Sequence, residues 1–226
     1  MSTLILHAVG IDEIRELFSG ADTTAASLRS WAAEAFPAPE PPPRTGLLDR
    51  LGPLTRRSPR APVVRAGVPT GRDLEDVLHG RDVPLERLDA AWALVDVWLT
   101  RVAWSTTHLT VGRAGLDAID FAATLAGVPA DDGIRRILNH QLALPLKDLP
   151  GQTSGYVRGA HALAMARAWE NALPTMDAPD PAFATDVSDW LARFSVWTAQ
   201  AEEDGRPSPD LVAFHRAGAT RPTITR

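Results

Sequence analysis

The chain of 226 residues contains no cysteine, which excludes disulfide bonds, thiolate metal sites and a cysteine nucleophile. Lysine is almost absent as well, because Lys147 is the one lysine among 23 basic residues. No apolar run approaches the roughly 20 residues that cross a bilayer, and the short apolar N-terminus lacks the basic region of a secretory signal. We therefore expect a cytoplasmic protein without a membrane segment.

Proline and basic charge are concentrated in one part of the sequence. Nine of the 19 prolines lie in residues 37–69, and residues 44–65 carry a net charge of +5 in a chain whose total is −5. This composition predicts a flexible insertion over residues 37–66. A basic arm for nucleic acid or an acidic partner is the alternative. The segment has no aromatic residue on which bases could stack, so we do not expect nucleic acid as a partner.

Short apolar runs at the two ends of the chain predict β-strands. Leu4–Val9 ends at Gly10, and Leu211–His215 follows a Pro-Ser-Pro turn that ends at Pro209. A single unpaired strand cannot satisfy its backbone, so these strands should pair with each other or with a third strand. Leu109–Val111 is the candidate for that third strand.

The sequence between the two ends has mostly helical periodicity. The strongest pattern, Pro84–Thr106, predicts a central helix with a wide apolar stripe. A polar loop is expected over Pro145–Gly155. The other predicted helices are Ile11–Phe18, Asp22–Phe36, Thr70–Gly80, Leu116–Ala126, Ile134–Ala143, Tyr156–Leu173 and Phe183–Asp204. The chain should thus form a mainly helical α+β domain from residues 1–36 and 67–216, with a frayed tail over 217–226.

Two histidines lie on the predicted terminal strands. Residues that alternate along a strand share a face, so His7 lies on a face with Ile5 and Val9, and His215 with Leu211. If the two strands are neighbours, the imidazoles could be close and form part of a pocket. The alternative is that each histidine is a hydrogen-bonded structural group.

A second candidate site is the start of the predicted helix Tyr156–Leu173. A helix N-terminus attracts anions, and Tyr156, Arg158 and His161 add polar and basic groups there. These residues predict a corner that could bind phosphate or carboxylate. The small polar residues before it lack the spacing of a nucleotide-binding P-loop, and ordinary loop and capping contacts are the alternative.

The remaining titratable clusters favour structural interpretations. Asp73, Asp76 and His79 resemble half of a di-metal site, but they lack the carboxylates and second histidine that such a site needs. Asp117 and Asp120 are typical of acidic residues near a helix N-terminus. We expect no metal site and no cofactor. The seven tryptophans are expected to fill the core, although two of them could wall an aromatic pocket.

Three segments of the sequence resemble the YfbM-like bacterial proteins of unknown function and their actinobacterial relatives. These are the opening strand and helix Leu4–Phe18, the helix Phe183–Asp204 with Trp190 and Trp197, and the closing Asp210–His215. The resemblance implies a single α+β domain, and it supplies no catalytic residue.

These observations predict a non-catalytic binding or protein-interaction module inside the cell, either immunity-like or accessory to a gene cluster. The basis is that the sequence has no cofactor-binding motif, no group of residues at metal-ligand spacing and no nucleophilic residue within a recognised catalytic motif. Its partner would be a protein or a small hydrophobic molecule, and the sequence does not predict the oligomeric state. The alternative is a small tailoring enzyme that acts on a hydrophobic metabolite in a tryptophan-lined cavity with a His/Asp pair.

Overall fold

A computed structural model describes residues 2–37, 65 and 67–218 of the chain. The strands are β1 (Ser2–Val9), β2 (Ser105–Val111), β3 (Gln152–Val157) and β4 (Asp210–Ala217). The helices before β2 are α1 (Ile11–Glu16), α2 (Asp22–Ala35), α3 (Gly71–Leu78) and α4 (Leu88–Val102). The later helices are α5 (Gly115–Leu125), α6 (Ile134–Leu138), α7 (Gly159–Ala172), α8 (Pro181–Ala192) and α9 (Phe194–Glu203). Short 3₁₀ turns cover Leu85–Arg87, Ala130–Asp132 and Leu173–Thr175.

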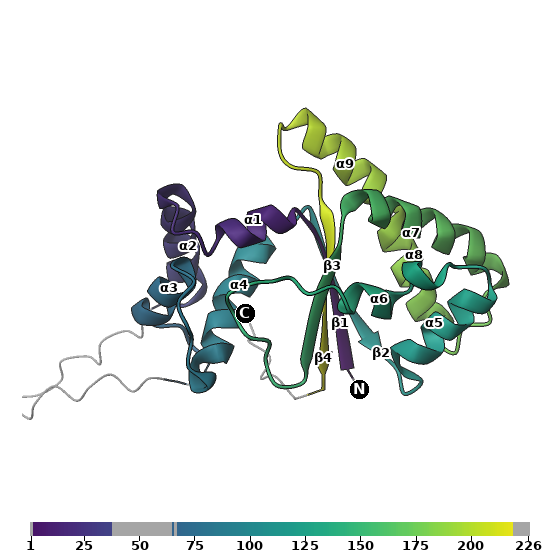
Figure 1. The fold of residues 1–226 in the computed structure, drawn as a ribbon, viewed down its shortest axis with the longest axis horizontal. Helices are drawn as coiled ribbons and strands as arrows, with labels where there is room; N and C mark the ends of the chain where they lie inside the picture. Colours follow the sequence, from purple (N-terminus) through teal and green to yellow (C-terminus); the bar gives the residue numbers. More distant parts are fainter. Residues whose placement is uncertain (1, 38–64, 66, 219–226) are drawn as a thin grey trace, which may run out of the picture.

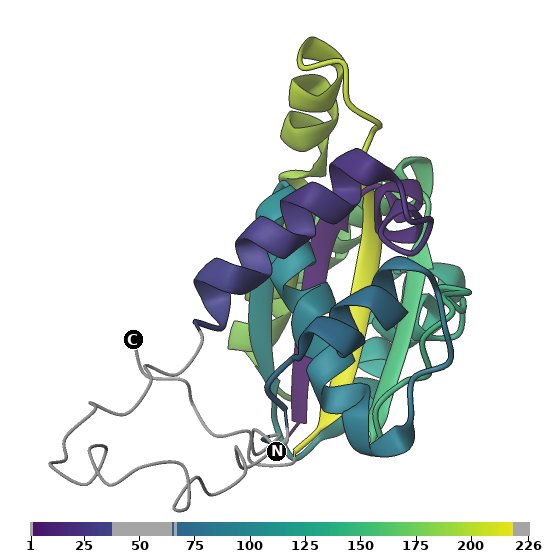
Figure 2. The same cartoon turned by 90° about the vertical axis from the view of Figure 1, so that its left-hand side faces the viewer.

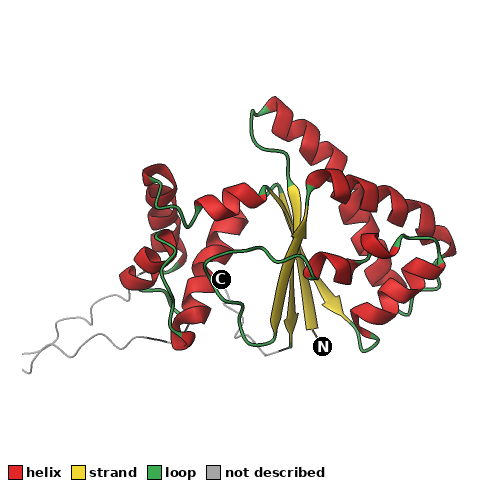
Figure 3. Cartoon of the chain, in the orientation of Figure 1, coloured by secondary structure: helices red, strands yellow, loops and turns green. Residues whose placement is uncertain are grey.

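The four strands form one antiparallel sheet between two layers of helices (Figures 1 and 3). The strand order is β2-β1-β4-β3, so the strands from the two ends of the chain pair at the centre of the sheet. The expected α+β fold with paired terminal strands is therefore confirmed. In Figure 2 the sheet is seen from the side of α1 to α4, with β2 at its left edge and β3 at its right edge.

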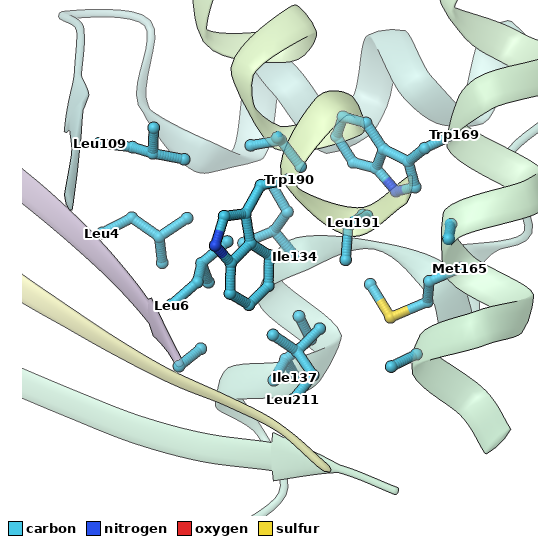
Figure 4. Close-up of a cluster of buried hydrophobic side chains, with 14 of the residues drawn as sticks. Leu4, Leu6, Leu109, Ile134, Ile137, Met165, Trp169, Trp190, Leu191 and Leu211 are labelled. Carbon is cyan, nitrogen blue, oxygen red and sulfur yellow. The ribbon is translucent and has the colours of Figure 1, made fainter. Parts of the chain in front are cut away.

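Each face of the sheet contributes to its own hydrophobic core. Alternate residues of β1 point to opposite faces, so Leu4 and Leu6 pack with the later helices, whereas Ile5 and Val9 pack with α1 to α4. Figure 4 shows the core of the later helices, in which Trp190 lies beside the strand residues Leu4 and Leu6 and Trp169 lies farther from them. A sheet covered on both faces must be apolar at successive positions, which explains the continuous apolar run in the first strand.

The expected bounds of the Pro84–Thr106 helix are wrong, and the sheet occupies the centre of the fold in its place, although its expected burial is confirmed because most residues of α4 are buried. Pro84 precedes a 3₁₀ turn, α4 ends at Val102, and Thr106 belongs to β2. The helix lies in the layer beside the sheet, where it packs against α2 and α3 (Figure 1). The capping prediction at Thr70 is confirmed, because its hydroxyl accepts a hydrogen bond from the amide of Asp73 at 3.4 Å.

β3 occupies a segment that was expected to be a polar loop followed by a helix. The predicted loop Pro145–Gly155 and the predicted start of the helix at Tyr156 are both wrong there, and α7 begins at Gly159. Gly155 in the middle of β3 weakened the strand pattern. It has a packing function, because a Cβ atom added there would overlap the carbonyl oxygen of Ile137 and lie 2.8 Å from the Cα atom of Leu138.

The expected single helix Phe183–Asp204 is two helices. The chain turns at Arg193, whose amide donates to the carbonyl oxygen of Trp190 at 3.2 Å, and α9 then leaves in a new direction (Figure 1). The turn brings Trp190 and Trp197 together, with ring centroids 5.1 Å apart. The predicted helix Ile134–Ala143 is also shorter and ends at Leu138.

The predicted flexible insertion over residues 37–66 lies almost entirely outside the described residues. The predicted tail overlaps the sheet at Ala217, the last residue of β4, and residues 219–226 lie outside the described part. No described helix is both long and apolar enough to span a bilayer.

The contact between Gly155 and α6 leads to a stability prediction. Gly155→Ala should lower the free energy of unfolding by about 3 kcal/mol or more, because backbone atoms of α6 must move to admit the methyl group. Gly71→Ala is the matched control, since no atom of the described residues lies within 4 Å of an added Cβ, and it should change stability by less than about 0.5 kcal/mol. Urea denaturation of both variants measures the difference, and equal stabilities would contradict the packing argument.

Candidate functional site

The carboxylate of Asp210 lies where β1 and β3 end and β4 begins. It is buried, with 5% of the residue exposed. Its Oδ2 atom accepts hydrogen bonds from the amide of Ile11 at 3.0 Å and from Nη1 of Arg158 at 3.1 Å. Its Oδ1 atom accepts from the amide of Gly159 at 2.9 Å. One side chain therefore satisfies donors from two helix starts and one guanidinium group.

The two amides explain why a charge is buried at this point. Ile11 and Gly159 are the first residues of α1 and α7, and the first amides of a helix have no partner within the helix. A negative charge there also interacts favourably with both helix dipoles. Gly159 allows the close approach, because a Cβ atom at this position would collide with the carbonyl oxygen of Pro209.

Arg158 forms the outer part of the same corner. Its side chain is 56% exposed and pairs with Asp210 at 3.1 Å and with Asp12 at 3.4 Å. Asp210 is the main cause that raises the pKa of Arg158 above its usual value. The guanidinium carbon lies 5.7 Å from the centroid of the Tyr156 ring, and Arg15 lies at the same distance from that ring.

The corner opens into a pocket of about 470 Å³. The pocket is lined by residues from α1, α7 and α9, from the first residue of β4 and from the turns that precede β4 and follow β1 and β3. These residues are Gly10, Asp12, Arg158, Gly159, Ala160, Leu163, Thr198, Pro207, Ser208 and Asp210. It contains two carboxylates and one guanidinium group. At the start of α7, where the sequence predicts an anion-binding corner, the internal carboxylate of Asp210 occupies the position that an external anion would take.

His161 does not line this pocket. It lies in the first turn of α7, and its Nε2 atom is 2.8 Å from Oδ1 of Asp132. The carbonyl oxygen of Asp132 in turn accepts from Nε1 of Trp169 at 3.0 Å. The structure therefore places Tyr156 and Arg158 together on one side of the start of α7 and directs His161 to a separate contact.

The expected proximity of His7 and His215 is wrong. β1 and β4 are neighbours, but the register pairs His7 with Val212 and His215 with Leu4. Paired residues share a face, so the two imidazoles lie on opposite faces of the sheet. His215 contacts the hydroxyl of Ser2 at 2.9 Å, and burial is the main cause that lowers its pKa.

His7 is a buried neutral group. Its Nδ1 atom is 2.9 Å from the hydroxyl of Thr106, and its ring packs edge-on against Phe214 with centroids 5.6 Å apart. Burial is the main cause that lowers its pKa from 6.5 to about 4, and the neighbouring His108 and Arg216 lower it further. The charge of Asp96 acts in the opposite direction. These contacts are those of a hydrogen-bonded structural histidine.

The other acidic clusters cap helices or form ion pairs. Asp73 caps α3 and pairs with Arg87. Asp120 accepts from the amides of Ile134 at 2.9 Å and Arg135 at 2.8 Å, at the start of α6. Among the residues that the structure describes, no three His, Asp or Glu side chains are grouped as metal ligands would be.

Sequence reasoning missed Asp210 and Asp12. An acidic residue directly before an apolar strand is a weak signal, because its two amide partners are 51 and 199 residues away along the chain. Comparisons with protein-family models, with curated proteins and with solved structures found no match. The resemblance to the YfbM-like proteins therefore stays a prediction.

Removing the carboxylate of Asp210 should destabilise the fold. We expect Asp210→Ala to lower the free energy of unfolding by about 3 kcal/mol or more, since it leaves two amides and a guanidinium group without their acceptor. Asp210→Asn keeps one acceptor oxygen and should lower the free energy of unfolding by less than Asp210→Ala does. The control is Asp12→Ala, which removes an exposed partner of the same arginine and should cost less than about 0.5 kcal/mol. Equal losses in Asp210→Ala and Asp12→Ala, measured by urea denaturation, would argue against this role.

The burial of His7 predicts a pH dependence of stability. Because the pKa is about 4 in the folded state and 6.5 for the free side chain, the unfolded state takes up the proton first as the pH falls. The contribution of the neutral His7 side chain to the free energy of unfolding is therefore fully present above about pH 6.5. It is lost progressively as the pH falls to about 4, and the total loss is on the order of 3 kcal/mol.

His7→Gln should flatten this dependence, which is measured by urea denaturation at a series of pH values. His140→Gln, at an exposed histidine, is the control and should keep the wild-type slope. A shallow slope of the same sign should remain in His7→Gln, because the pKa values of His108 and His215 are also lowered. A slope unchanged from wild type would refute the assignment.

Proposed function

We propose that this protein is a non-catalytic binding module that docks a protein partner on the outer side of α5. The observation that carries the proposal is the exposure of two large apolar side chains on this helix. Phe121 is 66% exposed and Leu125 is 74% exposed. They lie four residues apart, so they form one ridge on the same face of the helix. The ridge offers on the order of 200 Å² of apolar surface, which is smaller than the largest apolar patch of a typical monomer, so we infer that it is the anchor of a wider contact.

The helix that carries this ridge is firmly held by the rest of the fold. Its opposite face buries Leu116 and Ile119 in the core of the later helices. Asp120 ties it to the start of α6 through two backbone amides. A rigid helix that presents an apolar ridge pays little conformational entropy on docking, which favours recognition by a complementary groove.

The charges beside the ridge indicate the chemistry of the partner. Asp117 lies one turn before Phe121 on the same face and is paired with Arg135. Asp131, shortly after α5, is paired with Arg136 at 3.2 Å. Protein interfaces commonly have an apolar centre, and the charges beside this one are already neutralised by ion pairs. The surface therefore suits a partner with an apolar groove and an uncharged rim.

We also infer an intracellular role, as an immunity-like or gene-cluster accessory protein, because a chain without cysteine suits a reducing compartment.

The pocket beside Arg158 favours a second candidate function, which is small-molecule binding or an enzyme acting on a small metabolite. Its volume of about 470 Å³ lies in the range of ligand pockets. Neither histidine nor tryptophan lines it, and Trp92 lines a separate, smaller pocket of about 160 Å³. The ion pair of Arg158 and Asp12 would favour a polar ligand over the hydrophobic metabolite expected from the sequence.

A photoreactive phenylalanine analogue at position 121 tests the protein-binding proposal in cells that produce this chain. We expect position 121 to cross-link a specific protein and position 196 not to, since Val196 is similarly exposed, at 51%, but lies on α9. The captured protein is then purified, and its affinity for this chain is measured by calorimetry.

Phe121→Ser and Leu125→Ser should each weaken that affinity by about tenfold or more while leaving stability nearly unchanged. Val196→Ser is the control and should bind like wild type. Cross-linking of the same proteins at positions 121 and 196, or unchanged affinity in both serine variants, would count against the proposal and leave the pocket as the better candidate.

A further inference from the structure

The two edge strands of the sheet, β3 and β2, differ in how far the rest of the described chain covers them. At the β3 edge, the amide of Tyr156 donates to the carbonyl oxygen of His140 at 3.0 Å, and α6 packs against Gly155. The chain after α6 therefore covers part of that edge. At the other edge, the backbone of Ser105–Val111 makes no hydrogen bond in the described part of the chain beyond its ladder to β1. The outward amide and carbonyl groups of β2 are available to another strand.

The sequence of β2 contains none of the devices that keep an edge strand from pairing. Ser105–Val111 has no charged residue, no proline and no glycine, and three of its seven residues are threonine. Edge strands usually carry a lysine, a proline or a bulge that blocks addition of another strand. Thr106, His108 and Thr110 are exposed, because the helices on their side of the sheet do not cover this strand. In Figure 2, β2 is the outermost strand on the left.

We propose that β2 pairs with β2 of a second copy of this chain, which joins two sheets into one sheet of eight strands. An antiparallel pair of identical strands has a two-fold axis, and full overlap of Ser105–Val111 places that axis at His108. Thr106 then faces Thr110 of the second copy, and threonine pairs across strands are favourable. His108 faces His108 of the second copy.

The symmetric placement of Thr106 and Thr110 about His108 favours a second copy as the occupant, and the lack of charge on β2 permits it. The whole chain has a net charge of −5, whereas β2 is uncharged along its length. Two identical uncharged strands meet without opposing like charges, which would otherwise destabilise self-association. A ladder of two short strands buries less area than a standard interface, so we expect a reversible dimer that forms at micromolar or higher concentrations.

Opposite charges at position 108 test the proposed axis. His108→Glu and His108→Lys each place two like charges on the two-fold axis, so each variant alone should sediment as a monomer over about 1 to 300 µM, where wild type dimerises. An equimolar mixture of the two variants should restore the dimer, because Glu then faces Lys. Gln200→Glu, an exposed change on α9, is the control and should dimerise like wild type.

A single cysteine gives an independent measurement in this cysteine-free chain. His108→Cys should form a disulfide-linked dimer under mild oxidation, and Gln200→Cys should not. Phe121→Ser should still dimerise, which separates this proposal from partner binding on α5. A wild-type monomer at every concentration would overturn the proposal. So would dimers that persist in His108→Glu, a mixture that stays monomeric, or equal oxidation at positions 108 and 200.

Discussion

The contact between the carboxylate of Asp210 and the amides of Ile11 and Gly159 is the interaction on which the rest of the structure depends. It lies where the two central strands meet, and it fixes the starts of helices on opposite faces of the sheet. The α1 side and the α7 side are separate hydrophobic cores, and the sheet divides them. A single buried charge thus sets how both layers are oriented relative to the strands.

The pairing of the chain ends explains why this contact is possible. β1 leaves the sheet at Gly10 and β4 enters it at Asp210, and the antiparallel register places these two points side by side. The strands β1 and β4 therefore lie at the centre of the sheet, and the two edge strands, β2 and β3, come from the middle of the sequence. One of these, β3, is covered in part by the chain after α6, whereas none of the residues that the structure describes makes a backbone hydrogen bond to the outer edge of β2.

The sequence predicts the parts of the fold that depend on local periodicity. The terminal strands, most helices and the cap at Thr70 follow from apolar spacing and capping chemistry. The strand β3 was missed because Gly155, which weakens the local pattern, is required by a backbone that is remote in sequence. The break at Arg193 was missed because it contains neither glycine nor proline, and the packing of Trp190 on Trp197 is a tertiary effect.

The candidate site was predicted less well, for a related physical reason. Arg158 lies directly before a helix start, whereas Tyr156 belongs to β3. The face on which a strand histidine lies depends on the register between strands, and a single sequence does not encode that register directly. The register separated His7 from His215. The sequence does not indicate the role of Asp210, because two of its three donors are backbone amides, which carry no residue-specific signal.

The carboxylate of Asp210 already occupies the corner at the start of α7, and this affects where a ligand or partner can bind. An external anion that displaced Asp210 would leave a buried carboxylate without its donors, at a cost of several kcal/mol. A ligand in the pocket must therefore engage the exposed side of Arg158, where Asp12 already competes. The ridge on α5 and the edge of β2 have no such internal competitor in the described part of the chain. Binding there exposes no buried charge, which is why we assign recognition to these surfaces and a structural role to the corner.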